Sequence, residues 1–270
     1  MAARPGQPDV IVTNLFLTNM FVIVAGMTSK PGLPVSRRER PAKPALTRAG
    51  IIAAAVDVMR AEGLERVTMR RLAQELDTGP ASLYVYVRNT AELHAAILDE
   101  LLGAVDLGPA TAGGDWRSRL AQVLLSYTLV LYEHPSLARS ALVARPSGPH
   151  YLNLVEALLA LLSEGAVPGD RAAWGVDLLL QFATTNAAEH GTRTEAAGAR
   201  DEEDALAAAL REASSRAHPH ITALGAELLS GAGPDRLAWG FNVLINGVRH
   251  TARPESPAPP ELPGQQAKDR

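Results

Sequence analysis

From Thr47 to about residue 250, apolar residues recur at the three- and four-residue spacing of an α-helix, and no long stretch alternates apolar with polar residues. In the segment TRAGIIAAAVDVMRAEG, Ile52, Val56 and Met59 fall on one helical face, and Gly63 follows as a stop signal. The pattern predicts an all-α fold. After the first helix, we expect helices at about 68–76, 80–87, 90–107, 115–133, 136–144, 148–164, 169–191, 201–217, 219–230 and 234–250.

The two short segments at 68–76 and 80–87 flank a three-residue turn, which is the outline of a helix-turn-helix. Thr68 stands at a capping position, and Asp77 lies in the turn, where a short polar side chain tolerates a left-handed backbone. A second helix at a steep angle can enter a major groove about 12 Å wide. Helix pairs of this kind also occur as plain packing units, so the spacing alone leaves both interpretations open.

The helical faces of this unit separate core residues from candidate contact residues. Leu72, Leu76 and Leu83 are expected to pack against the first helix. The side chains left able to reach DNA are Arg70, Ser82, Tyr84 and Tyr86.

The run GLERVTMRRLAQELDTGPASLYVYVRNTAEL resembles the DNA-binding domain of the TetR family of bacterial repressors, and the similarity extends over residues 47–93. The positions that carry it are Gly63, Thr68, Leu72, Ala73, Leu83, Tyr84, Tyr86, Val87 and Asn89. The resemblance implies an N-terminal three-helix helix-turn-helix domain followed by a larger helical ligand-binding and dimerisation domain. Most members repress transcription until a small molecule binds. The implied partners are double-stranded DNA with a palindromic operator, a second copy of the chain and a small-molecule effector.

The resemblance also implies DNA contacts for individual side chains. Arg70 matches a position that contacts a base in several members, and Arg suits bidentate contact with guanine. Thr68, at a helix N-terminus, suits a phosphate contact. The expected DNA-binding residues are Thr68, Arg70, Gly79, Pro80, Ser82, Tyr84, Tyr86, Arg88 and Thr90. For Tyr84 and Tyr86 the alternative is packing within the domain.

Three positions depart from the family pattern. Thr78 stands where a branched apolar residue is usual, and its hydroxyl could cap the second helix of the motif. Asp77 replaces a common Gly. Thr90 replaces a Lys that typically holds a phosphate, and Arg88 could take that role.

Two later segments begin alike, DRAAWGVDLLL from Asp170 and DRLAWGFNVLI from Asp235. In the family, the corresponding helices pair with their copies as a four-helix bundle. The resemblance therefore implies a dimer interface at Trp174, Gly175, Trp239 and Gly240. The alternative is that the same faces pack within one chain.

A ligand pocket is expected among helices 115–133, 148–164 and 169–191. These segments are rich in Leu and Ala, so we expect an apolar small molecule as the inducer. Polar side chains on them are candidates for lining the pocket, although each could instead be a satisfied core or rim residue. They are Tyr127, Asn153, Gln181, Thr184, Thr185 and His190.

Charge is distributed unevenly along the chain. Residues 1–90 carry 12 Lys+Arg and 7 Asp+Glu, a net +5, and residues 91–270 carry 14 and 22, a net −8. A basic N-terminal segment followed by an acidic remainder suits contact with a polyanion such as DNA. A basic segment with Arg37, Arg38, Arg40 and Lys43 could follow the DNA backbone or minor groove, or could be a solvated linker.

The motifs of common catalytic sites are missing from the sequence. None of the seven histidines has a Glu three residues before it, and there is no His-Glu-x-x-His, Gly-x-Ser-x-Gly or Walker sequence. Without cysteine there is no disulfide, thiolate zinc site or cysteine nucleophile. These absences argue against an enzyme, and the resemblance to TetR repressors implies a transcriptional repressor, for which we expect no cofactor or metal. The alternatives are an all-α enzyme and a helical structural dimer that does not bind DNA.

The most apolar stretch, TNLFLTNMFVIVAGM at 13–27, precedes the helical region. Thr and Asn interrupt it as a membrane span, and a signal peptide would have only Arg4 as its positive region. The segment Thr18–Val22 can be back-translated into ACGAACATGTTCGT, which equals its own reverse complement and suits a two-fold dimer. We therefore expect a cytoplasmic protein, nucleoid-associated when bound, without membrane contact. We hypothesise autoregulation, with translation from Met27 and residues 1–26 as operator DNA read as protein.

Together these patterns predict four parts of the chain. Residues 1–45 form a disordered extension with the basic segment, and 46–92 form the helix-turn-helix domain. Residues 93–250 form the regulatory and dimerisation domain, and 251–270 form a disordered Pro-rich tail.

Overall fold

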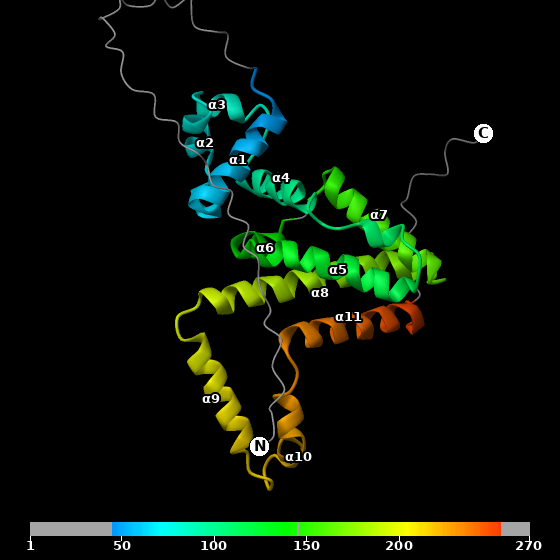
Figure 1. Ribbon diagram of the computed structural model, residues 1–270. Helices are drawn as coiled ribbons and strands as arrows, with labels where there is room; N and C mark the ends of the chain where they lie inside the picture. Colours follow the sequence, from blue (N-terminus) through cyan, green and yellow to red (C-terminus); the bar gives the residue numbers. More distant parts are fainter. Residues whose placement is uncertain (1–44, 145, 255–270) are drawn as a thin grey trace, which may run out of the picture. The chain divides into compact units, whose positions relative to one another are not determined.

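The computed structural model describes residues 45–144 and 146–254 of a chain that divides into two units, Met1–Ala45 and Leu46–Arg270. Every described helix belongs to the second unit (Figure 1). The fold of the described residues is all-α, as predicted, and they contain no strand. None of their helices is both long and apolar enough to cross a membrane. The basic segment 37–43, the palindrome-encoding segment 18–22 and the tail from 255 onward lie outside the described residues.

Four short elements form the head, residues 46–89. In chain order they are α1 (Arg48–Glu62), the 3-10 turn η2 (Leu64–Arg66), α2 (Met69–Glu75) and α3 (Pro80–Leu83). The predicted inward faces of α1, α2 and α3 meet in one core, where Val56, Leu72 and Leu83 are buried. The predicted turn signals also hold, since Gly63 has a φ of 90° and Asp77 a φ of 47°.

Longer helices form the body. In chain order they are α4 (Thr90–Leu102), the 3-10 turn η3 (Gly108–Ala110), α5 (Trp116–Tyr132), α6 (Pro135–Ala141), α7 (Pro149–Glu164), α8 (Gly169–Glu195) and α11 (Gly233–His250). α5 packs against α7, α8 and α11, and buries Leu120, Leu124 and Leu131. α4 contacts α1 as well as α6 and α7, so it connects the head to the body.

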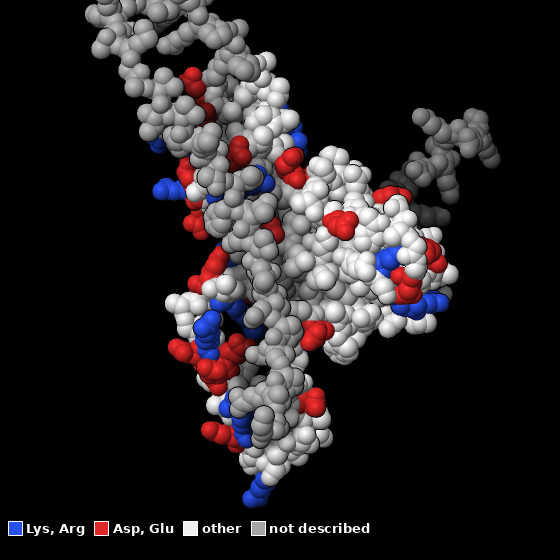
Figure 2. All heavy atoms as spheres, in the orientation of Figure 1, with Lys and Arg blue, Asp and Glu red and all other residues white. Residues whose placement is uncertain are grey.

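Two helices that lie between α8 and α11 in chain order, α9 (Ala199–Arg211) and α10 (Pro219–Leu228), pack mainly on each other and project away from the body (Figure 1). Neither contains a buried residue, and Leu206 and Leu224 are exposed. Acidic side chains gather over the start of α9 in Figure 2, where residues 201–204 are exposed. This placement agrees with a solvated first turn favoured by the helix dipole.

Several helix ends differ from the predicted ones for local reasons. α4 ends at Leu102 rather than near 107, because the N–H groups of Gly103 and Ala104 bond three residues back and tighten the chain into a turn. α8 continues to Glu195, where Thr192 Oγ1 donates to Ala188 O and Arg193 pairs with Glu189. The helix expected at 201–217 spans 199–211 instead.

Candidate DNA-binding site and ligand-binding region

The N-terminus of α2 is capped by Thr68, as predicted. Its Oγ1 accepts a hydrogen bond from Arg71 N at 3.1 Å, and the first intrahelical bond runs from Leu72 N to Thr68 O. The N–H groups of Met69 and Arg70 precede that bond and lie at the positive end of the helix dipole. This end of α2 is therefore suited to accept a phosphate.

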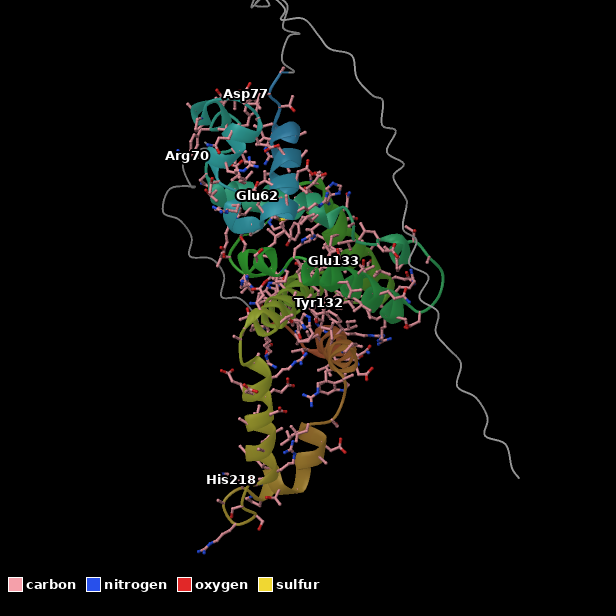
Figure 3. All side chains as sticks on the ribbon, turned by 60° about the vertical axis from the view of Figure 1, so that its left-hand side comes forward. Glu62, Arg70, Asp77, Tyr132, Glu133 and His218 are labelled. Atoms are coloured by element: carbon pink, nitrogen blue, oxygen red, sulfur yellow. The ribbon has the colours of Figure 1, made fainter. Side chains whose placement is uncertain are left out.

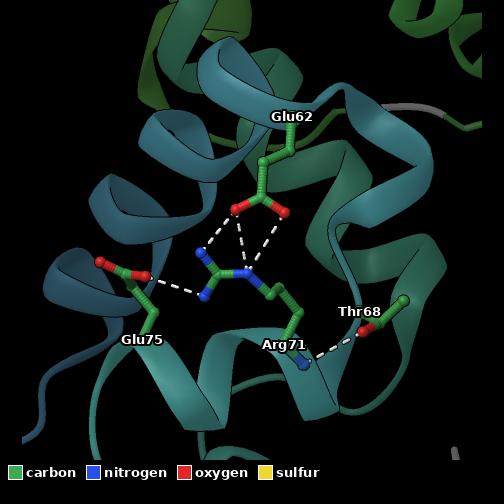
Figure 4. A network of polar contacts seen from close by, with 4 residues as sticks. All are labelled: Glu62, Thr68, Arg71 and Glu75. Atoms are coloured by element: carbon green, nitrogen blue, oxygen red, sulfur yellow. Dashed lines mark hydrogen bonds and ion pairs between the residues drawn. The ribbon is translucent and has the colours of Figure 1, made fainter.

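Two consecutive arginines on α2 have opposite environments. Arg71 binds Glu62 through Nη2 at 2.6 Å and Nε at 3.0 Å, and binds Glu75 through Nη1 at 2.8 Å (Figure 4). These bonds raise the pKa of Arg71, and the bond from Arg71 lowers the pKa of Glu62. Arg70 is exposed at the outer edge of the head (Figure 3) and makes no ion pair with any residue that the structure describes. The sequence reasoning missed Arg71, although Glu75 four residues later was an available signal.

The second helix of the motif is shorter than expected. α3 covers Pro80–Leu83, and the N–H groups of Tyr86 and Val87 then turn back to Leu83 O. Its N-cap is Gly79, without a side-chain cap, so the prediction that Thr78 caps it is wrong. Thr78 N instead donates to Ala73 O at 2.8 Å and closes the turn. The expected DNA-contacting residues at this tip, Gly79, Pro80 and Ser82, are all exposed.

The two tyrosines that follow α3 differ in their surroundings. Tyr84 is 52% exposed, so its ring can contact DNA. Tyr86 is half-buried, and its hydroxyl donates a hydrogen bond to Leu46 O at 2.8 Å. Tyr86 therefore anchors the start of the head, which is the packing alternative. A DNA contact of Tyr84 stays a prediction, whereas the Tyr86 hydroxyl already has a partner within the head.

Arg88 and Thr90 lie at the start of α4 and are both exposed. Asn89 caps the helix, and Glu92 accepts from the backbone N of Arg88 at 2.9 Å and from its Nε at 3.1 Å. These bonds lower the pKa of Glu92, the backbone bond most. The Arg88 side chain is 88% exposed, so its ion pair with Glu92 is weak and a phosphate can replace it.

The six candidate pocket residues do not come together. Tyr127 and Thr184 meet between α5 and α8, where their hydroxyl oxygens lie 2.8 Å apart and both side chains are buried. Burial raises the pKa of Tyr127 to about 12. The structure does not bring all six together, because the other four lie on the surface of the described chain. These are Asn153, Gln181, Thr185 and His190.

Gln181 and Thr185 continue a row of exposed residues on α8 that begins at Trp174, a predicted dimer-interface residue. Trp174, Leu178, Gln181 and Thr185 follow one another at helical spacing on α8, and all are exposed. His190 instead stacks on Tyr132, with ring centroids 4.4 Å apart. The phase of α8 therefore places Gln181 and Thr185 on its outer face.

The four predicted interface residues divide into two kinds. A Cβ at Gly175 would lie 2.5 Å from Val248 Cγ1, and a Cβ at Gly240 would lie 2.5 Å from Phe182 Cζ. Both glycines therefore allow α8 and α11 to pack within one chain, which was the alternative to a dimer contact. Trp174 and Trp239 are 52% and 69% exposed on the outer faces of the same helices.

Two family models match this architecture. Residues 51–97 match the model of bacterial regulatory proteins of the tetR family, and residues 108–252 match the tetracyclin repressor-like C-terminal domain. The chain belongs to the TetR family. It is therefore a DNA-binding transcription regulator by family, and members of the TetR family are generally transcription factors rather than enzymes.

Solved TetR-family structures resemble the chain over most of its length. SCO7704 from Streptomyces coelicor, assigned as a transcription regulator, is 58% identical with a TM-score of 0.67, and the match covers 80% of this chain and 100% of that one. ActR from Streptomyces coelicolor in complex with actinorhodin is 33% identical with a TM-score of 0.68, and the match covers 76% of this chain and 96% of ActR.

Similarity to curated TetR-family relatives is more local. The transcriptional repressor DrrR1 from Streptomyces coeruleorubidus is 39% identical over 128 residues, which are 47% of each protein. The class D tetracycline repressor from Escherichia coli is 31% identical over 120 residues. The chain spans about half the length of these curated relatives.

Proposed function

We propose that this TetR-family regulator is a homodimeric repressor that binds a two-fold symmetric operator and releases it when a small molecule binds the body. The observation that carries the proposal is the contrast on α2. Arg71 is held by two carboxylates, whereas Arg70 is exposed next to a capped helix N-terminus. A guanidinium that makes no ion pair with any described residue, beside a helix end suited to a phosphate, can contact a guanine while the backbone fixes the register.

In the proposed complex, the DNA-contacting surface consists of exposed side chains from three helices. Arg70 contacts a base, the tip of α3 enters the major groove, and Arg88 holds a phosphate at the start of α4. The complete proposed set is Thr68, Arg70, Gly79, Pro80, Ser82, Tyr84, Arg88 and Thr90. We assign this activity to a DNA-binding domain of residues 46–92 and regulation to residues 93–250, with α4 contacting both.

The test of DNA binding is a footprint on the DNA upstream of the protein's own gene. A two-fold symmetric protected site, bound with an affinity that falls steeply as salt rises, is the expected result. Equal protection of unrelated sequences would contradict sequence-specific repression. The hypothesis of autoregulation adds a stricter requirement, because the protected site should include the codons of Thr18–Val22. Codons that break the palindrome there would overturn that hypothesis alone.

The proposed dimer forms through the outer faces of α8 and α11. Trp174 and Leu178 on α8, and Trp239 and Val243 on α11, form an exposed apolar surface. When two such faces meet across a two-fold axis, Trp174 and Trp239 of each protomer are buried. The dimer then presents two heads, one for each half-site of the operator. Sedimentation should show a dimer for the wild type and for Leu152→Glu, an exposed site on α7, but a monomer for Trp239→Glu. A dimeric Trp239→Glu protein would contradict this interface.

The proposed effector binds between α5 and α8, where it takes over the hydrogen bond that joins the buried Tyr127 and Thr184. Tyr127 belongs to the same core as buried leucines and alanines of α5 and α8, so an apolar molecule with one hydrogen-bonding group fits best. ActR, in complex with actinorhodin, supports ligand binding by this fold. A screen for release of the footprinted DNA should find molecules whose effect is weakened by Tyr127→Phe. Release that is insensitive to Tyr127 would place the effector elsewhere.

A further inference from the structure

The helix that carries Arg70 is held in the head partly by apolar contacts. Met69, Leu72 and Ala73 form the buried face of α2. Burial decides which side of a helix turns inward, but the hydrophobic effect is not directional and does not by itself fix the roll of the helix about its axis. Because α2 has only seven residues, few apolar contacts restrain that roll.

A second, directional contact comes from Arg71 (Figure 4). Its Nη2 and Nε both donate to the carboxylate of Glu62, the last residue of α1, at 2.6 and 3.0 Å. Its Nη1 donates to Glu75, the last residue of α2 itself, at 2.8 Å. Of these two contacts, only the Arg71–Glu62 pair joins one helix to the other. A planar guanidinium that offers two N–H groups to one carboxylate fixes orientation as well as distance.

The two carboxylates occupy positions that their own helices do not favour. Glu62 ends α1 and Glu75 ends α2, and the helix dipole disfavours negative charge at a C-terminal end. The chemistry of an isolated helix therefore does not account for these acids, whereas their bonds to Arg71 do. The hydrogen bond from Arg71 is the largest cause that lowers the pKa of Glu62, so the pair is ionised at neutral pH.

The Arg71–Glu62 pair lies beside the residues proposed to contact DNA. Glu62 and Arg71 line a cleft of about 240 Å³ together with Thr68 and Arg70. Arg70 and Arg71 are consecutive on one helix, so a roll of α2 that breaks the pair also moves the side chain of Arg70. A side chain that reads a base must be held within about 0.5 Å of its productive geometry by the residues behind it.

We propose that Arg71 is a positioning residue for DNA recognition, because its two bonds to Glu62 fix the roll of α2 and thereby present Arg70 to one base pair. This inference deepens the proposed function and rests on the base contact of Arg70. Arg71 itself contacts no base, and its geometry rather than its charge is the property that matters. If charge alone mattered, lysine could replace Arg71, and loss of the Glu62 carboxylate would be harmless to recognition.

The test measures Arg71→Lys and Glu62→Gln on the operator and on operators substituted at the base pair for which Arg70→Ala loses its preference. The first change keeps the positive charge, and the second removes a negative one. Affinity for random DNA should therefore stay the same in Arg71→Lys and rise in Glu62→Gln. Preference at that base pair should nevertheless fall about threefold or more in both, because both break the pair. The double variant should lose no more preference than either single one.

Three further variants are controls. Glu75→Gln removes a bond within α2 and leaves the Arg71–Glu62 pair intact, so base preference should be retained. Arg193→Lys and Glu189→Gln repeat the two test changes in an exposed ion pair on α8 and should leave DNA recognition unaltered. Circular dichroism melting of each variant separates lost preference from lost stability, because a residue with a purely structural role would change the melting temperature without changing the base preference.

Full preference at that base pair in a folded Arg71→Lys or Glu62→Gln protein would overturn the inference. An equal loss in Glu75→Gln would also overturn it, since that bond does not join α2 to α1. If one of the two test variants loses its helical circular dichroism, the other decides. An Arg70→Ala protein that keeps every base preference would refute the proposed base contact and this inference with it. A loss in Arg70→Ala beside full preference in both test variants would refute this inference alone.

Discussion

The hydrogen bond between Tyr127 and Thr184 has a direction that two substitutions can test. Thr184 Oγ1 donates to Leu180 O at 2.8 Å, so its single proton is used and Tyr127 must be the donor in the 2.8 Å contact between them. Tyr127→Phe removes the donor and leaves Thr184 bonded to Leu180. Thr184→Val leaves a tyrosine hydroxyl without its acceptor in a side chain that is 4% exposed. The second change should therefore destabilise the protein more.

The expected losses in the free energy of unfolding are about 0.5–1.5 kcal/mol for Tyr127→Phe and about 1–3 kcal/mol for Thr184→Val. Urea unfolding followed by tryptophan fluorescence measures both, at one fixed protein concentration because dimerisation affects the result. The loss in the double variant should be smaller than the sum of the losses in the two single variants, because the double variant has no buried hydroxyl without a partner. A larger loss for Tyr127→Phe than for Thr184→Val would refute the assigned direction.

The same residue predicts how stability changes in alkali. Burial raises the pKa of Tyr127 to about 12, above its ordinary value near 10. The folded state therefore holds this proton more tightly than the unfolded state. The stabilisation that this pKa difference adds to the folded state is fully present below a pH of about 10 and is lost as the pH rises from about 10 to about 12. Wild type is about 0.5–1.5 kcal/mol more stable than Tyr127→Phe below that window. Across the window it should lose on the order of 2–3 kcal/mol relative to the variant and become the less stable of the two, and a constant difference would contradict the assigned burial.

Three further substitutions separate folding from DNA binding. Gly79→Ala should leave the melting temperature unchanged, because a Cβ there meets nothing within 4 Å. It should weaken operator binding, because the added methyl group keeps the α3 tip away from the DNA. Full operator affinity would exclude a close approach of this tip. Gly175→Ala should lower the free energy of unfolding by about 1–3 kcal/mol, because its Cβ overpacks against Val248. Gly247→Ala should not, because a Cβ there meets nothing within 4 Å in the protomer. Equal unfolding midpoints for the two variants would contradict the intrachain contact. Arg88→Ala should weaken all DNA sequences alike and reduce the salt dependence by about one phosphate contact per protomer, and a sequence-dependent loss would rule out a phosphate role.

The features that local chemistry controls could be predicted from the sequence. Thr68 caps α2 and Asp77 adopts a positive φ because each effect depends only on neighbouring residues. The apolar spacing likewise predicted the buried faces of α1 to α3, because burial of one face is what makes an amphipathic helix stable in a folded domain. The short α3 was not predicted in this way: it ends at Leu83, and the next residues form a turn in which Tyr86 N and Val87 N bond to Leu83 O.

The features that depend on packing between distant helices were harder to predict. Gln181 and Thr185 were expected in a pocket, but their spacing from Trp174 places them on the outer stripe of α8, a relation that the sequence alone already contains. Gly175 and Gly240 were expected at a dimer interface, but the side chains that they face, Val248 and Phe182, belong to the same chain. Small residues indicate that two helices approach closely, and they do not indicate which two.

The central claim is that Arg70 recognises a base, and its most direct measurement is the affinity of Arg70→Ala for operator variants substituted one base pair at a time. The variant should bind the intact operator about 1–3 kcal/mol more weakly than wild type and lose its preference at one base pair in each half-site. Arg88→Ala, measured beside it, should retain every base preference. A uniform loss for Arg70→Ala on all sequences, random DNA included, would show that Arg70 contacts only the backbone and would contradict the account.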